Sequence, residues 1–89
     1  MKKIFKYELE VTDIQHPKLP LGYEILSAGE QNGKLFIWAL VNSKNTPINT
    51  TIAIVGTGNP IMFNIDDFTF INTIQCANGL VLHVFHFID

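Results

Sequence analysis

Apolar and polar residues alternate strictly along residues 5–11, in the order FKYELEV. This period of two is typical of a β-strand that buries one face and exposes the other. Other apolar runs, rich in β-branched and aromatic residues, predict further strands. No stretch shows the period of a helix, so the pattern predicts an all-β protein. The further strands are residues 14–19, 23–30, 34–42, 50–55, 68–77 and 80–88.

Two Asn-Gly dipeptides, Asn32-Gly33 and Asn78-Gly79, separate consecutive apolar runs. Asn-Gly favours the positive φ angles of a two-residue type I′ turn, and the twist of that turn matches the twist of the strands it joins. The dipeptides therefore predict two hairpins, which join residues 23–30 to 34–42 and residues 68–77 to 80–88.

The segments outside these hairpins are less regular. Pro17 and Pro20 have no N–H group, which confines residues 14–19 to a sheet edge or a loop. Residues 43–49 are predicted to be an exposed loop, since they carry Asn, Thr and Pro. The pattern of residues 61–67 fits either a loop or a single helical turn.

Two of the predicted strands, residues 35–41 and residues 80–88, are apolar on both sides of the pleat. Such a strand is either central and buried on both faces, or has one face at an interface. Six or seven short strands with two Asn-Gly hairpins predict a small antiparallel barrel or sandwich. The whole chain, residues 1–89, is then a single β domain.

Composition and charge limit the number of domains and the kinds of partner that can be expected. The 89 residues are 47% hydrophobic, which is enough for one core and too little for two domains. Charged residues make up only 16% of the chain, against about 25% in a typical domain, so a homo-oligomer is expected. The net charge of −2 and the scattered lysines argue against binding to duplex nucleic acid.

Cysteine usage and hydropathy argue against an oxidising compartment and against a membrane location. Cys76 is the single cysteine, so an internal disulfide cannot form and a reducing compartment is expected. No apolar run approaches the roughly 18 residues that span a membrane, and none resembles a secretory signal. The sequence therefore predicts a cytoplasmic protein without a membrane partner.

The best candidate binding motif is Gly56-Thr57-Gly58-Asn59, which follows a predicted strand. Two glycines let the backbone turn its N–H groups into one concavity that can hold a phosphate. Thr57 and Asn59 can add side-chain hydrogen bonds. The alternative interpretation is a glycine-rich turn that simply ends the strand.

Tyr23, Trp38 and His83 are the other candidate ligand-binding residues. The flat rings of Tyr23 and Trp38 can stack on a base, and packing in the core is the alternative. His83 either lines the mouth of a pocket or is a hydrogen-bonded core residue. His86 lies three residues further along the strand, on the opposite face, so the two histidines predict no shared metal site. No cofactor is expected.

Four motifs follow one another along the chain: KYELEVTD, PLGYEILSAGEQNGKLFIWALV, GTGNPI and GLVLHVF. Their order resembles a family of short, uncharacterised proteins encoded widely in bacteriophages and in bacterial genomes that carry prophages. The similarity extends over about residues 7–85. It implies no established activity. What it implies is a setting, that of a small phage or prophage accessory protein in the cytoplasm of a bacterial host cell.

These observations together predict a non-enzymatic accessory protein that counteracts host defence. It would sequester a small nucleotide-type ligand or inhibit a host bacterial protein. A minor structural or assembly component of a phage is the alternative. A small hydrolase that uses His83 with Asp66 or Asp67 is less favoured, because the sequence places no nucleophile next to a base.

Overall fold

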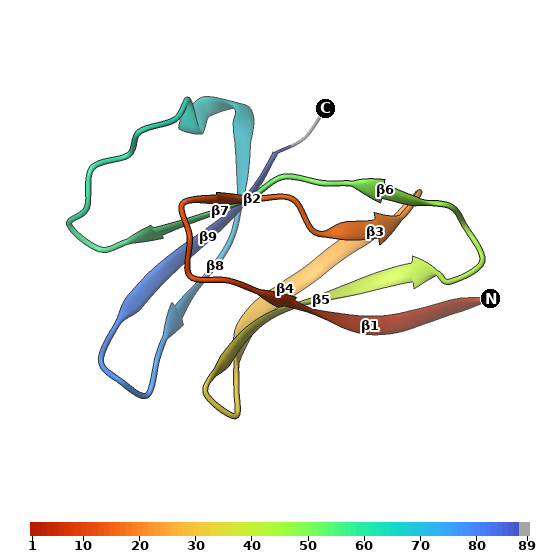
Figure 1. Ribbon diagram of the computed structural model, residues 1–89, viewed down its shortest axis with the longest axis horizontal. Coiled ribbons are helices and arrows are strands. Elements are labelled where there is room, and N and C mark those ends of the chain that lie inside the picture. The colour runs from red at the N-terminus through yellow and green to blue at the C-terminus, as the bar shows by residue number, and fades with distance from the viewer. Residues whose placement is uncertain (88–89) are drawn as a thin grey trace.

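The computed structural model describes residues 1–87, and its strands form three antiparallel sheets (Figure 1). The prediction of an all-β protein is confirmed. Ile88, the last residue of the final predicted strand, lies outside the described residues. The strands are β1 (Lys2–Leu9), β2 (Ile14–Gln15), β3 (Lys18–Pro20), β4 (Glu24–Gln31), β5 (Lys34–Asn42), β6 (Pro47–Asn49), β7 (Ile52–Gly56), β8 (Phe68–Gln75) and β9 (Val81–Phe87).

The strand order is β1-β5-β4 in a three-stranded sheet, β2-β7-β9-β8 in a four-stranded sheet and β3-β6 in a small ribbon. None of these sheets closes into a barrel, so the barrel is wrong as an architecture for this chain. Residues 14–19 form two short strands in different sheets, with Pro17 between them. Because proline cannot donate to a ladder, this segment does not supply the long strand that closure would need.

Two less regular segments are also resolved. Residues 43–49 are not a loop throughout, because Pro47–Asn49 forms β6 and pairs with β3. Residues 61–64 are a loop, and a single 3₁₀ turn, η1 (Ile65–Asp67), follows it. The Asn64 side chain accepts a hydrogen bond from the Asp66 N–H and so caps this turn.

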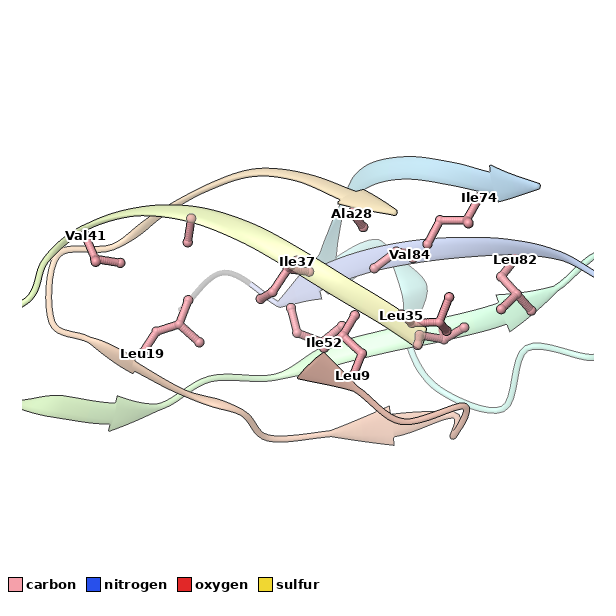
Figure 2. Packing of buried hydrophobic residues seen from close by; sticks show 12 residues of the cluster. Leu9, Leu19, Ala28, Leu35, Ile37, Val41, Ile52, Ile74, Leu82 and Val84 are labelled. Carbon is pink, nitrogen blue, oxygen red and sulfur yellow. The ribbon is translucent and has the colours of Figure 1, made fainter. Parts of the chain in front are cut away.

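The core lies between the three-stranded and the four-stranded sheet, and Figure 2 shows its side chains filling the space between their strands. On β5, residues 35, 37, 39 and 41 are buried, whereas Phe36, Trp38 and Leu40 on the other face are only half-buried. Strand β5 therefore buries one face in the core and leaves the other face partly exposed. On β7, by contrast, Ile52–Val55 are buried on both faces. Leu19, from the β3-β6 ribbon, is fully buried in the same cluster.

The two Asn-Gly dipeptides adopt different turns. Between β4 and β5, Gln31 faces Lys34, and Asn32 and Gly33 have φ angles of 54° and 78°. Between β8 and β9, the Cys76 N–H donates to the Leu80 carbonyl at 2.8 Å, so three residues form the turn rather than two. There only the glycine, Gly79 with a φ of 92°, is left-handed. This is the geometry of a type I turn followed by a left-handed residue.

Candidate functional site

The two larger sheets meet along β4 and β8, and the side chain of Asn72 makes a pair of hydrogen bonds between them. Asn72 on β8 accepts a hydrogen bond at Oδ1 from the Ala28 N–H (2.7 Å) and donates through Nδ2 to the Ala28 carbonyl (2.8 Å). The side-chain amide takes the place that a peptide group has in a regular β ladder. We call this contact the Asn72 bridge.

A β-bulge lies on each of these two strands, close to the Asn72 bridge. On β4 the pairing with β5 shifts by one residue around Leu26, and on β8 the pairing with β9 shifts around Ile71. A bulge bends its strand and re-aims the neighbouring side chains. The two bulges therefore change the direction of the side chains on both strands close to the Asn72 bridge.

A cavity of about 390 Å³ opens at the two bulges, and we call it the bulge pocket. Its walls combine apolar side chains with the polar groups of a tyrosine, a histidine, a threonine and a glutamate. This combination of apolar walls with a few polar groups is typical of small-molecule sites. The residues that line it are Tyr23, Glu24, Ile25, Leu26, Thr69, Phe70, Ile71 and His86.

Tyr23 and His86 contact each other in the bulge pocket. The Tyr23 hydroxyl lies 2.7 Å from Nε2 of His86, and the two rings meet edge to face with centroids 5.4 Å apart. Both side chains are half-buried. Each polar group can change between donor and acceptor as the imidazole changes tautomer. The pair therefore places two groups that can each donate or accept a hydrogen bond at the wall of the bulge pocket.

A second cavity, of about 380 Å³, lies at the glycine motif, and we call it the glycine-turn pocket. Gly56, Thr57 and Asn59 form one side of it, and Gly79 and Leu80 of the last hairpin form another. The structure thus brings the glycine motif and the second Asn-Gly turn together, although 18 residues, 60–77, separate them in the sequence.

The backbone of this motif is largely occupied by its own hydrogen bonds. The Thr57 N–H donates to the Val81 carbonyl and the Asn59 N–H to the Gly56 carbonyl, each at 3.1 Å. Gly58 has a φ of 85°, which suits the third position of a type II turn. A phosphate would have to compete with these internal acceptors, so the geometry favours the turn over the anion nest.

His83 lies beside the glycine motif on the face of β9 that points away from the core. Its Nε2 is 2.7 Å from the Thr57 hydroxyl, and its Nδ1 is 2.9 Å from the Thr73 hydroxyl. His86 points to the opposite face and contacts Tyr23. Among residues 1–87, no cluster of three or more histidine, cysteine or acidic side chains is placed to hold a metal ion.

Trp38 lies apart from both cavities, on the outer face of the three-stranded sheet. It is half-buried, and its ring centroid is 6.0 Å from that of Phe36. Gly29 on β4 makes room for the ring, because a Cβ there would lie only 3.2 Å from Trp38 Cζ3. The predicted site residues thus fall into three places: the glycine motif with His83, the bulge pocket with Tyr23, and this sheet face.

Sequence reasoning missed the part that His86, Asn72 and the two bulges play. The sequence pattern shows His86 only as a residue on the face opposite to that of His83. A bulge leaves a small signal in a sequence, namely one residue out of phase with the alternation, such as the exposed Leu26 (44% exposed). Asn72, a polar residue on the inner face of a strand, is the other signal, since such a group needs a partner.

Cys76 is half-buried next to Glu30 at the end of β4. Burial raises the pKa of the Cys76 thiol, and the Glu30 carboxylate raises it further by charge and by a hydrogen bond. Glu30 also accepts the Ala77 N–H at 2.9 Å. The thiol therefore stays protonated at neutral pH, which is unfavourable for a nucleophile.

These features define a small, open, all-β protein with two cavities of ligand size. The chain belongs to the family described as domain of unknown function DUF7352, whose model matches residues 1–88. No curated protein and no solved structure matches the chain. Within residues 1–87, no helix has the length and apolar character required to cross a membrane.

Proposed function

We propose that this protein is a non-enzymatic binding protein that captures a small ligand in the bulge pocket. The observation that carries the proposal is the coincidence of two β-bulges, on strands of different sheets, at one cavity of about 390 Å³. Bulges of this kind often adjoin functional sites. The Tyr23 and His86 pair supplies the polar groups that orient a ligand between apolar walls.

The charge of the lining residues narrows the ligand class. Glu24 is the charged residue of the bulge pocket, and its acidic side chain disfavours anions. No lysine lines either of the two larger cavities among the described residues, and the chain contains no arginine. A ligand with a neutral or cationic ring fits this lining best. For a nucleotide-type ligand, the base would enter the pocket and the phosphate would stay in solvent.

The surroundings of His83 support binding rather than turnover. Both of its ring nitrogens contact threonine hydroxyls, and neither contacts Asp66 or Asp67. A hydroxyl does not stabilise an imidazolium as the carboxylate of a catalytic triad does. The resemblance to phage and prophage proteins supports the biological role: sequestration of a host ligand, or inhibition of a host protein, in the bacterial cytoplasm.

A second candidate function is a minor structural or assembly component of a phage. It is favoured by the open sheets, because β1 ends the three-stranded sheet and leaves an edge that another chain can extend. Association of the protein with purified particles would support this function, and a pool that never sediments with particles would contradict it.

The experiment that tests ligand capture is a thermal-shift screen of nucleobases, nucleosides and their phosphates. We expect nucleosides or aromatic amines to raise Tm more than the matching phosphates, because binding to the folded state stabilises it by mass action. Tyr23→Phe removes the hydroxyl that contacts His86 and should abolish most of the shift. Tyr7→Phe is the matched control, since Tyr7 lies outside the pocket, on β1. Equal shifts for the two variants would refute the site.

A further inference from the structure

The β1 strand is a long open edge. Its pairing partner is β5, and no other strand within residues 1–87 pairs with its free side. Figure 1 shows β1 along the outside of the three-stranded sheet, leading to the N-terminus. Ile4 is 59% exposed and Phe5 is 40% exposed. An unpaired strand of eight residues with exposed apolar side chains is a template for another strand.

We propose that two copies of this chain associate through β1, antiparallel, with Phe5 facing Phe5 of the second copy. The two three-stranded sheets would then form one continuous sheet across a two-fold axis. The inference is independent of the ligand, since the bulge pocket lies on β4, at the other edge of the same sheet.

The charges along β1 favour this register over the two neighbouring ones. A two-fold axis perpendicular to the sheet places the same face of β1 on the same side in both copies. Even-numbered residues of one copy therefore face even-numbered residues of the other. With Phe5 on the axis, Lys2 faces Glu8 of the second copy, and this pair occurs twice. A shift of one residue in either direction at the axis places Lys6 opposite Lys6 or opposite Lys2. Like charges directly opposite each other destabilise a strand pair, so the neighbouring registers are disfavoured.

The apolar residues agree with the same register. Phe5 lies on the core face of β1, opposite Ala39 of β5, and is more exposed than Tyr7 and Leu9 on that face. A second Phe5 at the axis would cover it, and aromatic pairs stabilise antiparallel strands when they face each other. On the outer face, Ile4 would lie against the aliphatic part of Lys6 of the second copy.

Charge exchange tests the proposal. Size-exclusion chromatography with light scattering should show a dimer that dissociates on dilution. Lys2→Glu should raise the dimer Kd by about tenfold or more, because each substitution acts twice across the axis. The double variant Lys2→Glu with Glu8→Lys should restore the dimer. Both side chains are exposed, so the fold should be retained, and circular dichroism checks it.

Lys18→Glu is the matched control, because it makes the same charge change on the exposed side of β3 and should leave the Kd unchanged. A wild-type protein that is monomeric at every concentration would overturn the proposal. So would a dimer that Lys2→Glu does not weaken, or a double variant that stays as weak as the single one.

Discussion

At the scale of single residues, the pair of Cys76 and Glu30 gives a measurable pH dependence. Burial first and the Glu30 carboxylate second raise the pKa of the Cys76 thiol. Since the thiolate is the reactive form, alkylation by iodoacetamide should be slower at pH 8 than for an exposed cysteine. Glu30→Gln removes the charge and keeps an acceptor for the Ala77 N–H. It should speed alkylation, but only partly, because the burial remains.

The same shift has a consequence for stability. The folded chain holds the thiol proton more tightly than the unfolded chain does. The free energy of unfolding therefore declines in the pH range in which the unfolded chain has lost this proton and the folded chain still keeps it. The contribution of Cys76 is complete below the ordinary thiol pKa and is lost as the pH rises through the raised one. The alkaline loss should be smaller in Glu30→Gln. An unchanged alkylation profile in this variant would show that Glu30 does not act on the thiol.

Residue partners were the least predictable part of the site. The alternation of side chains along a strand correctly predicts that His83 and His86 point to opposite faces. It does not predict that Thr57 and Thr73 hold His83, or that Tyr23 contacts His86. These partners come from distant strands, and their meeting depends on how the sheets pack. A single sequence carries no local signal for that packing.

At the scale of elements, the two Asn-Gly turns show how tertiary packing overrides a local preference. A two-residue turn at Asn78 would place Ala77 opposite Leu80 and therefore Ile74 opposite His83. Residues directly opposite share a face, so one of these two would have to change faces. The observed three-residue turn places Ile74 opposite Leu82 instead, and both are buried. Burial of this pair outweighs the preference of the dipeptide.

The different turns predict different responses to the same substitution. Asn32→Gly should change the free energy of unfolding by less than about 0.5 kcal/mol, because glycine tolerates the positive φ that Asn32 adopts. Asn78 has no positive φ, and its Oδ1 accepts the Leu80 N–H at 3.0 Å. Asn78→Gly should therefore cost about 1 kcal/mol in lost hydrogen bonding and added chain entropy. Urea unfolding of both variants measures this, and equal costs would contradict the assignment of the turns.

At the scale of the whole molecule, the alternation of apolar residues was enough to predict strands and an all-β class, but not the number of strands or the closure of the sheets. Pro17 marks a break between two short strands, and β6 lies in a segment whose Asn, Thr and Pro content predicts a loop. Short edge pieces such as these bury few side chains, so they leave little pattern. Closure depends on the edges, which the sequence does not place.

The Asn72 bridge is one of the contacts that join the two larger sheets at β4 and β8, and its removal tests how far the sheets depend on it. Asn72→Ala leaves the Ala28 N–H and carbonyl without their side-chain partner in a half-buried place. The expected loss is about 2 kcal/mol, the usual cost of an unpaired buried backbone group. Asn45→Ala is the control, because Asn45 makes an exposed hydrogen bond to the Leu21 carbonyl, and this substitution should cost less.

Hydrogen exchange tests the Asn72 bridge itself. The Ala28 amide should lose protection in Asn72→Ala, and an amide that exchanges as slowly as in the wild type would mean that the bridge does not hold the sheets together.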